Sequence, residues 1–268
     1  MSSDLFQKAY FALLERDPSA KVAAAGALKT EWESGRLEWK QRVTPIEPIS
    51  EPGRPERPIL VSPREVGHRG VGTPQGRAAL IHAIAHIEFN AINLALDAAY
   101  RFRDLPREYY GDWLAVAADE AFHFTLLREY LQVLGYDYGS FSAHNGLWDM
   151  AVKTAHDPLI RMALVPRVLE ARGLDAAPAL IEKLQSAGDA RAVEIMKIIQ
   201  RDEIGHVRVG NRWYAFLCQQ HGFDSVEQFR ELLKRYDAPR FRPPFNFDAR
   251  RQAGFSDRDL SLLNEPVV

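Results

Sequence analysis

The chain has 268 residues, of which 46% are hydrophobic and 26% charged, so it is long enough to bury a sizeable core. Its formal net charge of −2 gives no overall basic bias of the kind that favours nucleic-acid binding. A single cysteine, Cys218, excludes an intramolecular disulfide framework and any metal site built from several thiolates, and it favours a reduced, cytoplasmic protein. No apolar run approaches the roughly 20 residues of a membrane span, and the N-terminal sequence does not resemble a signal peptide.

Residues 1–75 are expected to form an N-terminal arm. Two short helices are predicted between residue 4 and about residue 34, with a break at Asp17-Pro18, because the residue before a proline is pushed out of helical geometry. Six prolines in residues 45–63 predict an extended strap, since proline fixes φ and removes a backbone donor.

Residues 76–220 are expected to contain a bundle of four long helices. Apolar residues at three- and four-residue spacing predict these helices over residues 74–102, 106–134, 158–172 and 189–220. Thr73-Pro74 supplies an N-cap and a proline at the first helical position. In the glycine-rich turn before it, His68 and Arg69 could lie over one end of the bundle.

The second half of the bundle is predicted to contain a long connection, a kinked helix and a short separate helix. The connection over residues 135–157 is long enough to cross the bundle and contains a short helix. Pro166 is expected to kink the third helix and Gly173 to close it, so that residues 177–186 form a separate short helix. Residues 221–268 form a C-terminal extension, with a helix over 225–236 followed by an irregular, proline-rich tail.

The motif Glu-x-x-His occurs twice, as Glu120-x-x-His123 and as Glu203-x-x-His206. A single glutamate precedes each motif on the previous helix, Glu88 at a distance of 32 residues and Glu170 at a distance of 33. All six side chains fall on apolar helix faces, so the sequence indicates two copies of a helical hairpin with the same set of polar residues turned inward.

Carboxylates and imidazoles in this pattern point to a dinuclear metal site. Residues i and i+3 of a helix are about 60° apart in rotation, so both side chains of Glu-x-x-His can reach one point. Four buried carboxylates would be costly without cations, and two divalent ions would offset that charge. Oxygen ligands with two imidazoles suit iron, manganese or a mixed pair. The alternative is a core network of hydrogen-bonded ion pairs without a metal.

At these residues the chain resembles the ferritin-like di-iron carboxylate superfamily, over roughly residues 76–220. The stretches HRGVGTP, TAHD, VPRVLEARGLD and DEIGHV look more closely like a bacterial ferritin-like family without an assigned reaction, which is distantly similar to the di-iron tRNA hydroxylase. The resemblance implies an all-α, ferritin-like four-helix bundle with a long crossover connection, holding two metal ions, with iron favoured.

The resemblance also implies a role for each ligand. Glu120 and Glu203 would bridge the two ions. Glu88 with His123 would complete the coordination of one ion, and Glu170 with His206 that of the other. We also expect Asp119 and Asp202, which directly precede the motif glutamates, each to orient the histidine of the opposite hairpin.

A di-iron pair implies an oxidoreductase that uses O2 or peroxide. An oxygenase or oxidase acting on a small molecule is our first interpretation, because the arm, the long connection and the tail offer material to cover a pocket. A rubrerythrin-like peroxidase, a ferroxidase and a non-catalytic metal-binding scaffold are the alternatives. A separate electron donor is expected, because no rubredoxin-type module is present. A tRNA substrate and a homodimer through a bundle face remain open.

Overall fold

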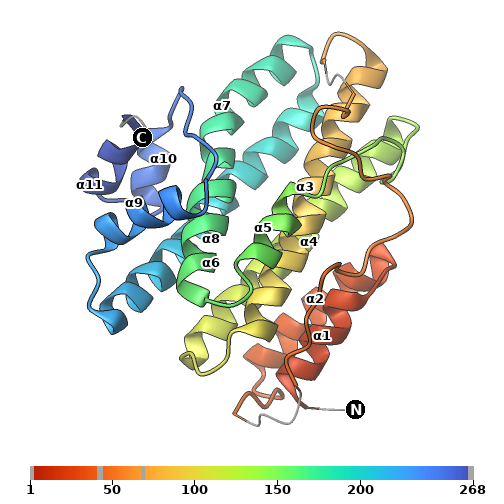
Figure 1. The fold of residues 1–268 in the computed structure, drawn as a ribbon. Helices are drawn as coiled ribbons and strands as arrows, with labels where there is room; N and C mark the ends of the chain where they lie inside the picture. Colours follow the sequence, from red (N-terminus) through yellow and green to blue (C-terminus); the bar gives the residue numbers. More distant parts are fainter. Residues whose placement is uncertain (1–2, 41–44, 68–69, 265–268) are drawn as a thin grey trace. The chain divides into compact units, whose positions relative to one another are not determined.

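The computed structural model describes residues 3–40, 45–67 and 70–264, and its regular structure is helical (Figure 1). Within these ranges there is no strand, only two isolated bridges, Asp4–Glu38 and Leu60–Ala143. The predicted all-α class is therefore confirmed. The chain divides into two compact units, Met1–Val152 with Asp189–Ile195, and Lys153–Gly188 with Met196–Val268. His68 and Arg69, for which the sequence suggests a place over one end of the bundle, lie outside the described residues.

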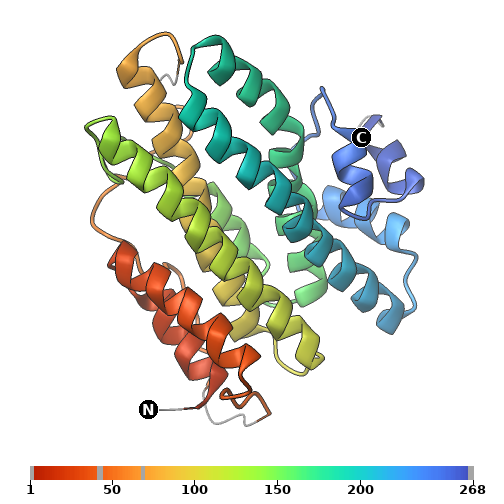
Figure 2. The same cartoon turned by 180° about the vertical axis from the view of Figure 1, so that it is seen from behind.

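The first unit is built on an antiparallel helix pair with a second pair packed against it. Its helices are α1 (Leu5–Leu14), α2 (Pro18–Glu33), α3 (Pro74–Arg101), α4 (Arg107–Val133) and α5 (Gly146–Lys153). α3 packs along α4, while α1 lies against α3 and α2 lies against α4, as Figures 1 and 2 both show. The N-terminal arm is thus an integral layer of this unit.

The local signals in the N-terminal half of the sequence act as predicted. Asp17 caps α2 by accepting a hydrogen bond from the Ala20 amide, and Pro18 occupies the first turn. The Thr73 side chain caps α3 in the same way. Residues 45–63 form neither a helix nor a strand, which agrees with the predicted strap.

α3 forms the centre of the first unit. In the described part of the chain it is the one helix that is long and apolar enough to cross a membrane, but 89% of its most apolar window is buried, as in the core helix of a soluble protein.

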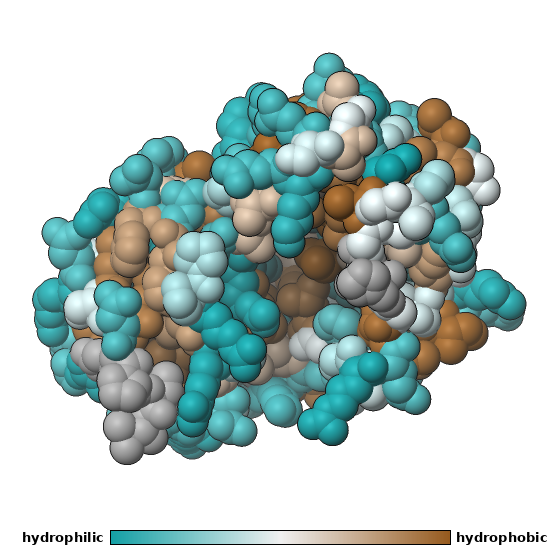
Figure 3. Space-filling model, turned by 90° about the horizontal axis from the view of Figure 1, so that it is seen from above, coloured by the Kyte–Doolittle hydropathy of each residue, from teal (hydrophilic) through white to brown (hydrophobic). Residues whose placement is uncertain are grey.

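Hydrophilic residues are spread over the face of the molecule drawn in Figure 3, with apolar residues between them.

A lysine is buried in the core of the first unit. Lys21 is 0% exposed, and its ammonium group donates hydrogen bonds to the Leu13 carbonyl at 2.8 Å and to Asn93 Oδ1 at 2.6 Å. Burial lowers the pKa of Lys21 to about 7, although the charge of Glu15 acts in the opposite direction. Two neutral acceptors do not fully replace the hydration that the charged amine loses.

The second unit combines long helices with a folded C-terminal tail. It contains α6 (Pro158–Leu164), η1 (Val165–Glu170), α7 (Ala171–Ser186), most of α8 (Ala190–His221), α9 (Ser225–Arg235), α10 (Phe247–Gln252), α11 (Asp257–Ser261) and η2 (Leu262–Asn264). Asp189 begins α8, since its side chain accepts a hydrogen bond from the Ala192 amide.

The prediction that Gly173 closes the third helix is wrong. Helical structure runs from Pro158 to Ser186, with the π-helical segment η1 in its middle, so that residues 177–186 belong to the same helix. Gly173 is exposed and a Cβ placed on it would meet nothing within 4 Å. The buried stripe of Leu174 and Ala177 holds α7 in place, and this burial outweighs the weak helix propensity of one glycine.

The prediction that the tail beyond residue 236 is irregular is also wrong in part. Asn246 caps α10, and Ser256 caps α11 in a reciprocal pair of hydrogen bonds with Asp259. Apolar residues from the tail join a core cluster with residues of α7 and α8, namely Ala171, Leu174, Val207, Ala249, Ala253, Phe255, Leu260 and Leu263. The tail is rich in proline and arginine, but these capping and packing contacts determine its structure.

Lys21 should make the stability of the protein depend on pH. Its folded-state pKa of about 7 lies below the ordinary value of 10.5, so the unfolded chain binds the proton more tightly and stability rises from pH 7 towards pH 10. We expect Lys21→Met to reduce this rise by about 3 kcal/mol, measured by urea unfolding at several pH values. Lys29→Met, in the same helix but partly exposed, is the control. Equal pH slopes for the parent and Lys21→Met would contradict the assignment.

Candidate metal centre

Three of the six predicted ligands meet inside the first unit. Glu88 comes from α3, and Glu120 and His123 come from α4. His123 Nδ1 lies 3.2 Å from Glu88 Oε2 and 3.5 Å from Glu120 Oε2. All three residues are buried, with exposed fractions of 3%, 2% and 0% for Glu88, Glu120 and His123. The ligand atoms that these residues offer lie within 4.8 Å of one another.

The packing of α3 on α4 fixes this arrangement. Phe89 and Phe124 directly follow Glu88 and His123, and their ring centroids are 5.2 Å apart. Both rings are buried, and each also contacts Tyr138. This aromatic contact joins the two helices at the level of the polar residues. The i, i+3 spacing then brings Glu120 onto the same side of α4 as His123.

The two carboxylates stabilise the positively charged form of the His123 imidazole. Burial lowers the pKa of His123, but the hydrogen bonds and charges of Glu120 and Glu88 outweigh it and raise the pKa to about 11. Without a metal ion, the imidazole of His123 therefore carries a proton at neutral pH. A divalent ion would supply positive charge in place of that proton and would displace it, because a histidine ligand binds as the neutral ring.

The spacing of these atoms fits a common metal ion. Ligand atoms at about 2.1 Å from an ion and separated by 90° to 110° lie roughly 3.0 to 3.5 Å from one another. The two distances from His123 Nδ1 fall in this range. The same distances also fit a protonated histidine between two carboxylates, so the geometry admits both a metal ion and an ion pair.

The other three predicted ligands lie in the second unit. Glu170 is the last residue of η1, and Glu203 and His206 lie on α8. His206 Nδ1 is 3.6 Å from Glu203 Oε1, which repeats the arrangement of Glu120 and His123 in the first unit. His206 is buried, with an exposed fraction of 4%. Each unit thus contains two glutamates and one histidine of the predicted set.

The π-helical segment follows from Pro166. Proline has no amide hydrogen and its ring collides with the carbonyl four residues earlier, so an α-helix cannot pass it undisturbed. The wider turn absorbs this conflict, and the Ala171 amide bonds the Pro166 carbonyl, five residues before it. The sequence correctly marks Pro166 as a disturbance, but the structure accommodates it with a π-helical turn that leads directly to Glu170.

Close packing aligns Glu170 with the motif on α8. A Cβ on Gly210 would lie 2.3 Å from the Cβ of Pro166 and 2.5 Å from its Cγ, so the two backbones approach at this point. α7 is followed by α8 after a short loop, which makes the two segments antiparallel. About one turn from this contact, in opposite chain directions, lie Glu170 and His206. These are the two residues predicted to complete the coordination of one ion.

The proposed orienting role of the two aspartates stays a prediction. Asp119 Oδ1 lies 3.6 Å from the ammonium group of Lys29, and the Asp119 side chain is 45% exposed. Asp202 accepts two hydrogen bonds from its neighbour Arg201, at 2.7 and 3.0 Å. These contacts give each carboxylate a partner within its own unit.

The two histidines of α3, His82 and His86, contact the long connection. His86 Nδ1 lies 2.9 Å from the Tyr138 hydroxyl, and its Nε2 lies 3.0 Å from the His144 carbonyl. His82 Nε2 accepts a hydrogen bond from the Gly139 amide at 2.9 Å. Both histidines are buried. They attach residues 138–144 to α3, on a side of the helix away from Glu88.

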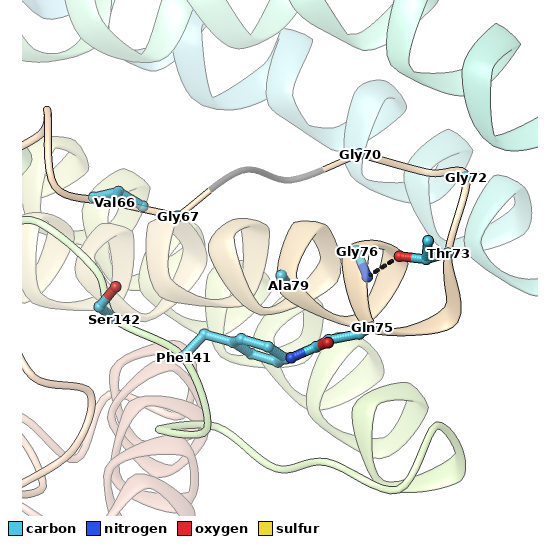
Figure 4. Close-up of a pocket in the computed structure, with 10 residues that line it drawn as sticks. All are labelled: Val66, Gly67, Gly70, Gly72, Thr73, Gln75, Gly76, Ala79, Phe141 and Ser142. Atoms are coloured by element: carbon cyan, nitrogen blue, oxygen red, sulfur yellow. Dashed lines mark hydrogen bonds between the residues drawn. The ribbon is translucent and has the colours of Figure 1, made fainter.

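A pocket of about 460 Å³ lies at the N-terminal end of α3. Thr73, Gly76 and Ala79 line it from the start of the helix, and Phe141 and Ser142 line it from the long connection (Figure 4). Ala79 precedes Glu88 by nine residues, which is roughly 14 Å along a helix. None of the six predicted ligands lines this pocket, so it is separate from the candidate centre.

Comparisons with known proteins identify the family of the chain, but they name no activity for it. Residues 14–261 match the family described as "Protein of unknown function (DUF455)". A Haemophilus influenzae protein described as "Uncharacterized protein" is 54% identical over 218 residues, which cover 79% of this chain and 76% of that relative. No solved structure matches the chain.

The contact between Pro166 and Gly210 can be tested with a pair of glycine substitutions. Gly210→Ala should lower the free energy of unfolding by about 1 to 3 kcal/mol, because the new methyl group would overlap the proline ring. Gly173→Ala should instead raise it by about 0.5 to 1 kcal/mol, because alanine is the better helix former at an exposed position. Chemical denaturation of both variants measures the difference. A neutral Gly210→Ala would rule out the close approach.

Proposed function

The chain belongs to the DUF455 family, and we propose that it is a dinuclear-metal oxidoreductase with a ferritin-like bundle. The bundle would consist of α3, α4, the helix formed by α6, η1 and α7, and α8. The observation that carries this proposal is the buried set of Glu88, Glu120 and His123, in which two carboxylates converge on one imidazole nitrogen. The second unit repeats the same residue types.

The proposed ligands fall into two groups related by the sequence repeat. Glu88 and His123 would hold one ion, and Glu170 and His206 would hold the other. Glu120 and Glu203 would bridge the pair. The glutamate–histidine distances of 3.5 Å and 3.6 Å are consistent with this repeat, because the two side chains of each motif lie about equally close together.

Iron is the proposed metal, with manganese or a mixed pair as the alternatives. Carboxylate oxygens with two imidazoles suit these ions, whereas softer ions prefer thiolates. A reduced iron pair would supply electrons to O2 or peroxide. The residues of the chain would hold the ions, balance their charge with four carboxylates and exclude bulk water from buried positions such as Glu120 and His123.

An oxygenase or oxidase acting on a small molecule is the function we propose. Cys218 is the one cysteine of the chain and is buried, so a separate protein would have to deliver electrons. The cytoplasm is the proposed compartment and no membrane partner is proposed. A peroxidase, a ferroxidase and a metal-binding scaffold remain the alternatives to be separated by experiment.

Metal content tests the site directly. Protein purified without added metal should carry close to two iron or manganese ions per chain, measured by mass spectrometry of the digested protein. Glu120→Ala and Glu203→Ala should both lose most of this metal, because each removes a proposed bridging ligand. Glu129→Ala on α4 and Glu194→Ala on α8 are matched controls, since both glutamates are exposed on the same helices.

A parent protein that stays metal-free after anaerobic loading with ferrous iron would contradict the proposal. The six residues would then have to act as a protonated, hydrogen-bonded network, as the raised pKa of His123 allows.

Oxygen uptake separates an enzyme from a scaffold. We expect the anaerobically reduced, metal-loaded protein to consume O2 when it is mixed with air-saturated buffer, with a rate that falls to the buffer background in Glu120→Ala. Persistent metal binding without oxygen uptake would favour the scaffold. Growth of a ferric mineral on repeated additions of ferrous iron would favour a ferroxidase over an oxygenase.

A further inference from the structure

Arg167 is an arginine buried inside the π-helical segment, three residues before Glu170. Its exposed fraction is 3%. Nη1 donates a hydrogen bond to Asn211 Oδ1 at 2.7 Å, and Nη2 donates one to Asp259 Oδ1 at 2.6 Å. The guanidinium group therefore joins η1 to α8 and to the C-terminal helix α11.

Aromatic rings enclose the same guanidinium group. The ring centroids of Tyr214 and Phe229 are each 4.4 Å from its central carbon, and that of Phe255 is 4.9 Å away. These rings come from α8, from α9 and from the residues just before α11. A cation held between ring faces away from water interacts strongly with them. Arg167 is thus fixed on several sides by residues far from it in the sequence.

The folding of the tail and the placement of Arg167 depend on the same carboxylate. Asp259 accepts hydrogen bonds from the Ser256 amide at 2.9 Å and the Ser256 hydroxyl at 2.5 Å. The Ser256 hydroxyl oxygen in turn accepts a hydrogen bond from the Asp259 amide, and this reciprocal pair caps α11. Burial raises the pKa of Asp259, but the charge of Arg167 and the hydrogen bonds of Ser256 outweigh it and hold the pKa below its usual value. Asp259 therefore stays ionised beside the arginine.

A second connection runs through Asn211. Its side-chain amide donates a hydrogen bond to the Ala253 carbonyl at 2.7 Å, while its oxygen accepts from Arg167. Asn211 lies on α8, five residues after His206. The tail thereby contacts both segments that carry the proposed ligands of the second unit, the one with Glu170 and the one with His206.

We propose that Arg167, Asn211 and Asp259 form a clamp through which the C-terminal tail fixes η1 and so positions Glu170 for metal binding. The effect on metal binding rests on the proposed function, whereas the hydrogen bonds of the clamp lie within the second unit and do not depend on a metal. Arg167 is a positioning residue, since it contacts no proposed ligand directly in this arrangement of hydrogen bonds. The tail then determines how well the second ion is held.

The test removes both charges of the clamp together, so that no buried charge is left alone. In Arg167→Met/Asp259→Asn, hydrogen–deuterium exchange of the amides in Val165–Ala171 should become about tenfold faster or more, while α3 and α4 keep their protection. The folded variant should bind about one ion per chain where the parent binds two. Circular dichroism verifies that helical content is retained.

The matched control is a second buried arginine–aspartate pair of the tail. Arg250 donates hydrogen bonds to Asp175 at 2.9 and 2.6 Å, and it attaches α10 to α7 without contacting Arg167. Arg250 also lies 3.4 Å from the Ala171 carbonyl, so this control disturbs the end of the same segment. Arg250→Met/Asp175→Asn should lower stability but leave both ions bound.

The two readouts separate the clamp from the metal site. If the parent binds no metal, the proposed function fails, and faster exchange in Val165–Ala171 still supports the clamp. Unchanged exchange in the folded clamp variant would overturn the clamp, whatever the metal content. Faster exchange with two ions still bound at unchanged affinity would overturn the positioning of Glu170. If the clamp variant does not fold, the same measurements are made on Arg167→Lys. This variant keeps the positive charge but lacks the planar guanidinium group that bonds two acceptors at once.

Discussion

Two carboxylates that converge on one buried imidazole are the constraint on which the first unit depends. Glu88, Glu120 and His123 are buried in the core of the first unit, where an unbalanced negative charge is costly. Either a proton or a metal ion has to occupy the space between them. The aromatic pair Phe89–Phe124 holds the two helices so that this space persists. The apolar packing thus fixes polar groups that would repel each other without a cation.

The second unit reaches a similar set of residues by a different route. Two of its ligand candidates come from the regular helix α8, but Glu170 ends a π-helical segment that Pro166 imposes. Gly210 allows this segment to approach α8 closely, because no side chain larger than hydrogen fits there. A π-helical turn is rare within an α-helix, so contacts from outside the helix are expected to support it. Arg167 and its partners can provide that support.

The sequence predicts the parts of the fold that depend on short-range signals. Asp17-Pro18 separates the first two helices and Thr73 begins α3, because caps and prolines act within a few residues. The Glu-x-x-His spacing likewise identifies the pair Glu120–His123. Gly173 misled the prediction, because an exposed glycine with room around it can lie within a helix when neighbouring residues are buried. The low helix propensity of Gly173 is outweighed by the burial of neighbouring residues, and the sequence alone does not show which residues become buried.

The role of Arg167 could not be predicted, because its partner Asp259 lies 92 residues further along the chain. In the sequence it is a charged residue beside a proline, and a solvent-facing position would be the ordinary interpretation. Its burial is stable only because a carboxylate, an amide and three aromatic rings surround it. All of these come from α8 or from residues beyond it, so the contacts of Arg167 join η1 to later parts of the chain. The sequence suggests the tail only as material to cover a pocket, whereas its contacts with Arg167 support the proposed clamp on η1.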